Sequence, residues 1–524
     1  MYDYIIVGSG FGGSVSALRL AEKGYKVAVL EKGKRWRPED FPKTNWVLHK
    51  FYWMPRLFMY GIQCMTLLRD VFVLHGAGVG GGSLVYANTL PIPKDKVFDD
   101  PRWGEITKQT LMPFYRLAYK MLGAALPPEA AMNPTDYKLK EIAEEKGMGH
   151  TFEKHPLSIF FGEPEVEVDD PYFGGRGPRR SGCVYCGGCM VGCRYNAKNT
   201  LDKNYLYLAE QLGVEIFPET EVIDVLPEAE GYRVITRRPT GWLRHPRKEW
   251  HTKGVIFSGG VLGTVRLLLK LKDKGSLPNL SEKLGDFVRT NSEALGGALT
   301  HDPNLDCSKG VAINSGVDVD ENTHIEVVRY GAGQDAQGIL KTVLTEGGKG
   351  IPRQLWWLDT IFRHPIRFLR SLLPFGFAKK AAILLVMQPN NNYLRLSYKR
   401  RWILLGRKGF TTEWQTDAKV PKYMPVANDA FRRMAEKIQG EPMSMLPEVL
   451  FGVATTAHIL GGCSMGKTPQ EGVIDFQGRV FGYENLYVID GSMVPTNLGV
   501  NPSLTITALS EYMLSQFPKK KHAA

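Results

Sequence analysis

The sequence predicts an α/β domain joined to a second, α+β domain, and three features of the chain carry this prediction. A buried strand, a glycine-rich turn and a helix open the chain, as in a parallel sheet with crossover helices. Segments of the same kind return near residues 255 and 486, so both ends of the chain contribute to the first domain. Residues 271–450 lack them and contain the candidate strands 381–388 and 392–398, the second with alternating apolar residues. We place the sheet of the second domain there.

Length and composition limit the class of protein. A chain of 524 residues is too long for one simple core, and 43% apolar with 23% charged residues is typical of a globular protein. Lys and Arg exceed Asp and Glu by 66 − 54 = 12, which favours an anionic partner. No nucleic-acid module signature is present, so we expect no nucleic-acid partner and a peripheral contact with an acidic membrane surface.

The start of the chain, its apolar runs and its cysteines indicate the cellular compartment. The chain begins with a strand rather than a signal peptide, and the apolar run Ala381 to Met387 is too short to cross a bilayer. Seven cysteines, an odd number with four of them clustered, argue against a disulfide framework. We therefore expect a cytoplasmic protein, placed at the inner face of the membrane where it meets lipid.

The first glycine-rich turn has the pattern of a dinucleotide site. A strand from Tyr4 to Val7 precedes G-x-G-x-x-G, a helix over 14–23 follows, and a second strand over 26–30 ends at Glu31. Such glycines allow close backbone approach to a pyrophosphate at the helix N-terminus, and the acid accepts hydrogen bonds from a ribose. A βαβ unit without a ligand is the alternative.

Other segments complete the predicted nucleotide site. A second glycine-rich stretch covers 76–83, a strand and turn cover 255–260, and another strand and turn cover 485–491. The residues predicted to contact the cofactor are Gly8, Gly10, Phe11, Gly12, Gly13, Glu31, Gly76, Gly78, Gly80, Gly81, Gly82, Ser83, Val222, Gly259, Asp490, Gly491, Asn501 and Pro502.

Taken together these motifs resemble the glucose–methanol–choline (GMC) oxidoreductases, in their cholesterol-oxidase-like branch. The specific matches are 80–85, 458–463 and 499–503. The resemblance implies FAD, a Rossmann-like α/β flavin domain of the GMC type, a substrate domain built on an antiparallel sheet, and catalytic roles for His458 and Asn501. It supplies no position for the glutamate base of steroid isomerisation.

The expected domains are discontinuous. The FAD-binding domain takes 1–40, 74–95, 181–300 and 451–517; the substrate or cap domain takes 41–73, 96–180 and 301–450; and a basic tail, expected to be disordered, takes 518–524.

The residues at the predicted catalytic end suit alcohol oxidation. A neutral imidazole at His458 takes the hydroxyl proton while the flavin N5 receives hydride. Asn501, followed by Pro502, has the pattern of a helix N-cap, and that helix would direct its positive end toward reduced flavin. The alternatives are a core histidine and an asparagine that only caps.

A cysteine cluster is the second candidate redox site. Cys183, Cys186, Cys189 and Cys193 have C-x2-C-x2-C-x3-C spacing, which is typical of ferredoxins, although Arg194 replaces their proline. The spacing predicts a 3Fe-4S or 4Fe-4S iron–sulfur cluster that passes electrons to an acceptor protein or quinone. A zinc or regulatory thiol site, and thiols that only pack, are the alternatives.

Two stretches, 45–60 and 355–374, combine Trp and other aromatic residues with Arg. They suit a lipid interface or the wall of an apolar pocket, and both imply an apolar substrate. The predicted function is FAD-dependent oxidation of a hydroxyl group on a sterol or another long apolar alcohol, with electrons leaving through the cysteine cluster. Alternatives are a dioxygen-using oxidase, a flavin-dependent lipid lyase or isomerase, and a membrane-bound flavin carrier.

Overall fold

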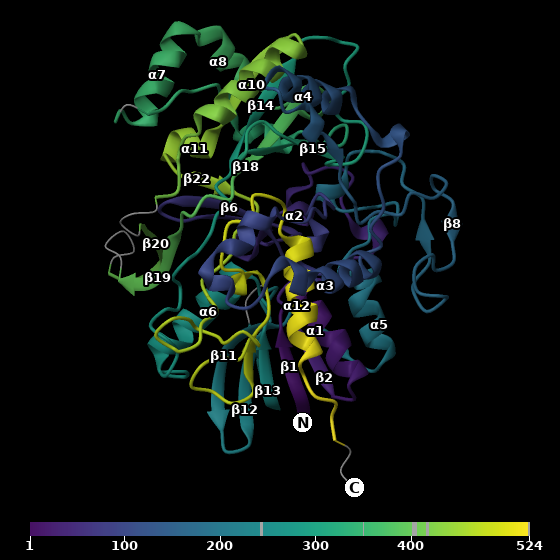
Figure 1. Cartoon of the computed structure of the whole chain (residues 1–524), viewed down its shortest axis with the longest axis vertical. Helices are drawn as coiled ribbons and strands as arrows, with labels where there is room; N and C mark the ends of the chain where they lie inside the picture. Colours follow the sequence, from purple (N-terminus) through teal and green to yellow (C-terminus); the bar gives the residue numbers. More distant parts are fainter. Residues whose placement is uncertain (242–244, 349, 401–405, 415–418, 522–524) are drawn as a thin grey trace.

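The computed structural model describes residues 1–241, 245–348, 350–400, 406–414 and 419–521. Two sheets lie in separate layers, one near both termini and one at the opposite end (Figure 1). The cavity described below lies between them. No helix in the described part of the chain is long and apolar enough to cross a membrane.

The first sheet has the predicted Rossmann-like core. Its strand order is β10-β2-β1-β13-β12-β11, and β23 also pairs with β13. β1, β2, β10, β23 and the end of β13 are parallel, whereas β11, β12 and β13 form an antiparallel meander. The bounds are β1 Tyr2–Val7, β2 Val27–Leu30, β10 Glu215–Phe217, β11 Glu221–Glu228, β12 Gly231–Arg237, β13 Arg247–Phe257 and β23 Leu486–Val488.

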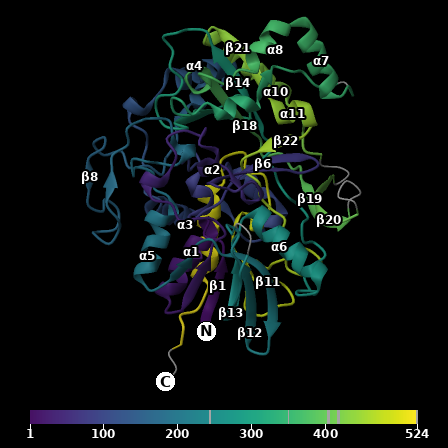
Figure 2. The ribbon, with the colours of Figure 1, turned by 180° about the vertical axis from the view of Figure 1, so that it is seen from behind.

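Helices from both ends of the chain cover this sheet. α1 (Phe11–Glu22) packs beside α12 (Ser503–Ser515), with α3 (Lys108–Met121) and α5 (Tyr205–Gln211) around them (Figure 1). α6 (Val261–Lys274) lies beside β11 on the side seen in Figure 2. One continuous core of aliphatic and aromatic side chains joins these helices to the strands, which fixes the first glycine-rich turn against the C-terminal segments.

The second sheet is antiparallel throughout, as predicted for the substrate domain. Its order is β17-β21-β14-β18-β16-β15-β7. The bounds are β7 Glu153–Lys154, β14 Ala294–Thr300, β15 Ser315–Asp318, β16 His324–Val328, β17 Lys341–Val343, β18 Ala381–Met387 and β21 Gly440–Met445. One face packs on α4 (Pro134–Glu145) and α10 (Pro425–Lys437), and the other faces the cavity.

One predicted strand belongs elsewhere. β19 (Leu394–Arg400) pairs only with β20 (Lys408–Trp414) among the described strands, so its placement in the substrate sheet is wrong. Leu394 and Leu396 are fully buried in the core of the first domain, beside α6. Alternating apolar residues indicate a half-buried strand, but they do not specify which surface buries it.

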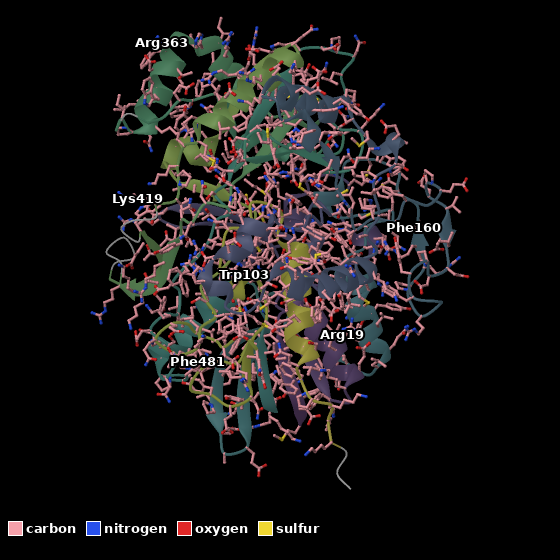
Figure 3. The ribbon with its side chains drawn as sticks, viewed as in Figure 1. Arg19, Trp103, Phe160, Arg363, Lys419 and Phe481 are labelled. Carbon is pink, nitrogen blue, oxygen red and sulfur yellow. The ribbon has the colours of Figure 1, made fainter. Side chains whose placement is uncertain are left out.

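Two smaller features position functional residues. A three-stranded sheet of β5 (Gln63–Leu67), β6 (Val71–Gly76) and β22 (Ala454–Thr456) leads into the second glycine-rich loop and toward His458. α7 (Arg353–Arg363) and α8 (Pro365–Ser371) form an outlying pair, with Arg363 at one extreme of the molecule (Figure 3).

The basic tail is ordered as far as it is described. Lys520 donates from its backbone N–H to the Lys23 carbonyl (2.9 Å), and its Nζ lies 2.5 Å from Asp3 Oδ2. The expectation of a disordered tail is therefore wrong up to residue 521, and 522–524 lie outside the described residues.

Candidate active site

A cavity of about 800 Å³ lies between the two sheets. Most residues predicted to contact the cofactor line it: Gly8, Gly10, Phe11, Gly12, Glu31, Gly76, Gly81, Gly82, Val222, Gly259, Asp490, Gly491, Asn501 and Pro502. His458 lines the same cavity. The fold therefore brings segments from both ends of the chain around one space.

Four of the predicted contacts shape the loops instead of lining the cavity: Gly13, Gly78, Gly80 and Ser83. A Cβ on Gly13 would lie 2.2 Å from the Gly8 carbonyl oxygen, so this glycine allows α1 to pack on the turn. Ser83 Oγ donates to the Gly80 carbonyl (2.7 Å) and accepts from the Leu201 N–H (3.1 Å). These four residues fix the conformation of the loops whose other residues line the cavity.

Glu31 ties the two glycine-rich loops together. One carboxylate oxygen accepts from the Ser9 N–H (3.1 Å) and hydroxyl (2.8 Å), and the other accepts from the Gly33 N–H (2.8 Å). The second oxygen also receives the Gly78 N–H at 3.4 Å. Glu31 thus fixes the mouth of the predicted nucleotide site.

Asp490 performs the same task at the opposite side of the site. Its Oδ2 accepts from the Gly260 N–H (2.8 Å) and the Thr264 hydroxyl (2.6 Å), and its Oδ1 accepts from the Ser492 N–H (2.8 Å). Burial raises the pKa of this carboxyl above its usual value. Asp490 therefore joins the end of β23 to the start of α6 beside the cavity.

His458 follows β22 and pairs with a carboxylate that the sequence did not reveal. Its Nδ1 lies 2.5 Å from Glu293 Oε1, and the other Glu293 oxygen accepts the Ala457 N–H at 2.8 Å. Burial alone lowers the pKa of the imidazole, but the Glu293 carboxylate outweighs it, so the pKa of His458 is raised. The pairing keeps a proton on Nδ1 and leaves Nε2 as the base.

Asn501 stands beside His458, and its side chain does not cap a helix. The N-cap of α12 is Pro502, without a side-chain capping bond, so the prediction that Asn501 caps is wrong. Asn501 Nδ2 instead donates to Glu326 Oε2 (3.1 Å) and lies 3.5 Å from His458 Nε2. Among the described residues its buried Oδ1 has no partner, which leaves a hydrogen-bond acceptor for a ligand.

A strained segment fixes this geometry. Asn291 and Ser292, directly before Glu293, both have positive φ, 58° and 44°. Asn291 holds the chain near Asn501: its N–H donates to Asn497 Oδ1 (2.8 Å), its Oδ1 accepts the Gly499 N–H (2.8 Å), and its Nδ2 donates to the Val500 carbonyl (3.1 Å). Conformations of this kind cost about 1–3 kcal/mol each and concentrate at functional sites.

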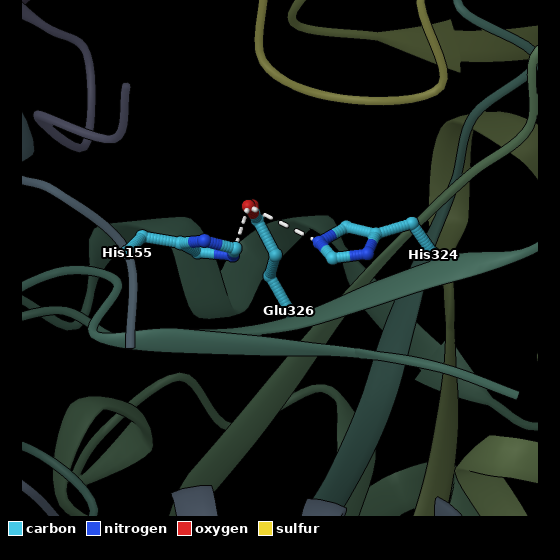
Figure 4. A group of neighbouring side chains, drawn as sticks. All are labelled: His155, His324 and Glu326. Carbon is cyan, nitrogen blue, oxygen red and sulfur yellow. Dashed lines mark ion pairs between the residues drawn. The ribbon is translucent and has the colours of Figure 1, made fainter. Parts of the chain in front are cut away.

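Glu326, which accepts the Asn501 amide, lies between two buried imidazoles (Figure 4). Its Oε1 is 3.3 Å from His155 Nε2 and 3.8 Å from His324 Nε2. Burial favours the neutral acid, but the two histidines outweigh it and lower the pKa of Glu326 to about 2. The charge that receives the Asn501 amide is therefore permanent at ordinary pH.

The four clustered cysteines pack without forming a metal-ligand group. Cys183 is buried against Leu157, Ile159 and Val311, where burial raises the pKa of its thiol well above the usual value, whereas Cys186 is exposed. Across the described ranges, the one grouping of His, Cys, Asp and Glu with metal-ligand spacing is His155, His324 and Glu326. The arrangement of the thiols therefore does not support the predicted iron–sulfur cluster.

The remaining cavity wall is largely apolar where it meets the second sheet. This wall consists of Leu74, Met190, Leu295, Ile313, Val328, Phe377, Ile383, Leu385 and Met443. The glycine-lined end fits the FAD dinucleotide: at Gly10, the N-cap of α1, a Cβ would have no atom of the chain closer than 4.0 Å. The apolar end, with His458 and Asn501 beside it, leaves room for a hydrophobic alcohol.

Comparisons with known proteins agree with this arrangement. Residues 405–510 match the GMC oxidoreductase family, and residues 6–38 match the NAD(P)-binding Rossmann-like domain. The cholesterol oxidase of Acinetobacter baumannii is 45% identical over 532 residues, covering 99% of this chain and 95% of its own length. That of Mycobacterium tuberculosis strain H37Rv is 45% identical over 99% of this chain and 91% of its own length. A long-chain-alcohol oxidase of Arabidopsis thaliana, FAO4B, is 25% identical over 96% of this chain and 65% of its own length.

The solved structures show the fold. The pyridoxine 4-oxidase of Mesorbium loti superposes with a TM-score of 0.59 at 16% identity and covers 100% of both chains. An FAD-dependent oxidoreductase of Chaetomium thermophilum gives 0.57 at 15% identity, covering 98% of both. The chain therefore belongs to the GMC oxidoreductase family, in its cholesterol-oxidase-like branch, and is an FAD-dependent alcohol oxidoreductase.

Proposed function

We propose that the chain oxidises the hydroxyl group of a sterol or another long apolar alcohol. The observation that carries this proposal is the convergence of His458, paired with Glu293, and Asn501 on a cavity with apolar walls. The names of the cholesterol oxidases and long-chain-alcohol oxidases to which the chain is similar support the same substrate class.

In this proposal each side chain has a separate role in the reaction. The hydroxyl lies between His458 Nε2 and Asn501, and Nε2 accepts its proton while Glu293 stabilises the imidazolium. Bound FAD supplies the hydride acceptor. Pro502 and Ser503, at the start of α12, line the cavity, so the positive end of this helix favours the negative charge that reduction brings. The apolar wall excludes water from the reacting carbon.

The electron acceptor in the proposal is dioxygen. The described thiols are not grouped as metal ligands, and the similar proteins carry the name oxidase. The experiment measures ketone or aldehyde, peroxide, iron and acid-labile sulfide on protein purified without oxygen. One peroxide per oxidised alcohol and no iron supports the proposal. Stoichiometric iron and sulfide with little peroxide supports the cluster prediction, with an acceptor protein or quinone. A product of unchanged oxidation state supports a lyase or isomerase.

The paired carboxylate predicts a change in the pH profile. The base is neutral His458, so kcat/KM of the wild type decreases as the imidazole becomes protonated at low pH. Because Glu293 raises the pKa of His458, this acidic limb lies above the ordinary imidazole pKa of about 6.5. Glu293→Gln removes the largest influence that raises the pKa of His458 and leaves burial opposed only by the Glu326 carboxylate, so this acidic limb moves to lower pH. The maximum of kcat/KM falls roughly 10-fold or more, because the imidazolium loses its counter-charge. Steady-state rates across pH check both changes, and an unmoved limb contradicts the role of Glu293.

We also propose that the chain meets an anionic lipid bilayer through α7, α8 and the loop that follows. Exposed apolar side chains gather there: Leu355, Leu358, Phe362, Ile366, Leu369, Leu372, Leu373 and Phe375. Arg363, Arg367 and Arg370 lie among them, and the chain has a net charge of +12. Trp46, from the other aromatic stretch, stacks on Phe375 with ring centroids 6.0 Å apart. These features favour the membrane interpretation over the pocket-wall alternative.

This surface leads to the cavity. Phe377, two residues after Phe375, lines the cavity, as does Lys341, whose Nζ donates to the carbonyls of Ser371 and Leu373, both at 2.8 Å. A sterol leaving a bilayer at α8 would therefore have a short path to the apolar wall.

The double variant Phe362→Asp/Ile366→Asp tests the lipid contact. Burying each side chain contributes roughly 1.5–3 kcal/mol, so binding to vesicles of anionic phospholipid weakens at least about 10-fold. Turnover of detergent-dispersed alcohol stays unchanged. Leu212→Asp, an exposed leucine at the end of α5, is the matched control. Equal vesicle binding by the double variant and the wild type contradicts the proposal.

A further inference from the structure

We propose that His155, His324 and Glu326 bind a divalent transition-metal ion, with Zn²⁺ as the natural probe, at a buried site behind Asn501. Two imidazoles and one carboxylate are a ligand set that such ions accept. The site lies outside the substrate cavity, since none of the three residues lines it.

The sheet brings these ligands together. His324 and Glu326 are two residues apart on β16, so they point to the same face, while Ile325 and Val327 pack in the core on the other face. β15 separates β16 from β7, with Gly316 opposite Glu326 on one side and opposite Glu153 on the other. His155 directly follows β7, so it approaches the same point from the far side of β15.

The distances suit a shared cation. Glu326 Oε1 lies 3.3 Å from His155 Nε2 and 3.8 Å from His324 Nε2, and one ligand atom from each residue lies within 4.8 Å of the other two (Figure 4). Bonds of about 2.1 Å in tetrahedral geometry separate neighbouring ligand atoms by about 3.4 Å. The observed spacing is therefore close to that of a coordination shell.

The atoms that face one another lack hydrogen-bond partners. His155 Nε2, His324 Nε2 and Glu326 Oε1 are all buried, and none makes a hydrogen bond in the described part of the chain. The side chains of His155 and Glu326 are 1% and 0% exposed. Ion pairs join Glu326 Oε1 to each imidazole, and one cation would replace both pairs and coordinate all three atoms.

Gly316 keeps the space between the imidazoles open. A Cβ built on this residue would lie 2.4 Å from His324 Nε2 and 2.5 Å from His155 Nε2. Both nitrogens thus approach one point that any side chain would block. The glycine has no positive φ, so a turn does not require it.

The opposite atoms of two ligands are already tethered, as in known metal sites. His324 Nδ1 lies 3.0 Å from Asp318 Oδ1, which directs Nε2 toward the site. Glu326 Oε2 accepts the Asn501 amide at 3.1 Å, so binding through Oε1 leaves that contact intact. An ion here would hold Glu326 in place and, through it, Asn501.

The test uses the full chain with FAD bound. Chelator-treated protein is dialysed against Zn²⁺, and bound metal is measured by mass spectrometry and calorimetry. The wild type is expected to take up close to one Zn²⁺ per chain. His155→Ala, His324→Ala and Gly316→Ala should each retain less than about a tenth of it, and Asp318→Asn should bind roughly 10–100-fold more weakly.

His301→Ala is the matched control, because it removes an exposed imidazole outside the site and should bind Zn²⁺ as the wild type does. FAD content confirms that each variant folds. If a histidine variant does not fold, Gly316→Ala still tests the site, because it keeps all three ligands. No uptake by the wild type, or equal uptake by the ligand variants, overturns the proposal and leaves an ion-paired His–Glu–His group.

Discussion

Replacing His458 with alanine is expected to lower kcat/KM for a sterol or long-chain alcohol at least about 10³-fold while FAD remains bound. His458 Nε2 is the free base beside Asn501, and Glu293 occupies the other ring nitrogen. General-base catalysis by a positioned side chain contributes 10²–10⁴-fold, and the alanine variant also loses the counter-charge that the imidazolium gives the reacting site. Steady-state rates with a detergent-dispersed alcohol measure the loss.

The flavin spectrum controls for folding of the His458 variant. The imidazole pairs with Glu293, directly before β14 of the second sheet, and makes no contact on which the first glycine-rich turn depends, so the ratio of FAD to protein should equal that of the wild type. Unchanged turnover in a fully loaded variant would contradict the assignment. It would favour a flavin carrier or another base.

Gly12→Ala is expected to abolish FAD binding together with cooperative folding of the first domain. A Cβ at this position would lie 1.9 Å from the Ile489 carbonyl oxygen, and the three nearest atoms, from Ile489 and Asp490, all belong to the backbone. The start of α1 would have to move away from the turn after β23, which Asp490 holds against α6. Overpacking of this kind, without a side chain that can yield, is among the largest single-residue effects. Soluble yield, circular dichroism and flavin content measure it.

Gly10→Ala is the matched comparison. Its added Cβ would be 4.0 Å from the nearest atom of the chain, and its φ of −71° suits alanine. The protein should therefore fold, but FAD should bind at least about 10-fold more weakly, because the methyl group occupies the approach of the pyrophosphate to α1. Wild-type flavin content in Gly12→Ala, or in both variants, would contradict the assigned place of the dinucleotide.

The Rossmann-like core was predictable because its signals are local. A strand, a glycine turn and a helix must follow one another in sequence, and β1, α1 and β2 lie within a few residues of the expected bounds. The antiparallel sheet was predictable only as a class. β19 shows the limit, since Leu394 and Leu396 have the pattern of a sheet strand yet are buried beside α6.

The active site was only partly accessible from sequence. His458 and Asn501 stand out through family motifs, whereas Glu293 follows two residues with positive φ and no motif marks it. Glu293 and His458 are 165 residues apart, so only a comparison of related sequences could have revealed that they pair. Asn501 was expected to cap because Asn-Pro often begins a helix, but Glu326 takes its amide instead. The cysteine spacing predicted an iron–sulfur cluster, but spacing alone does not determine the direction in which each thiol points.

Anaerobic mixing of the purified chain with a sterol or long-chain alcohol shows whether the bound flavin oxidises such an alcohol with His458 as the base. We expect one FAD per chain, bleached by the alcohol in the wild type and at least about 10³-fold more slowly in His458→Ala. Bound flavin that no such alcohol reduces, or that His458→Ala reduces at the wild-type rate, would contradict it.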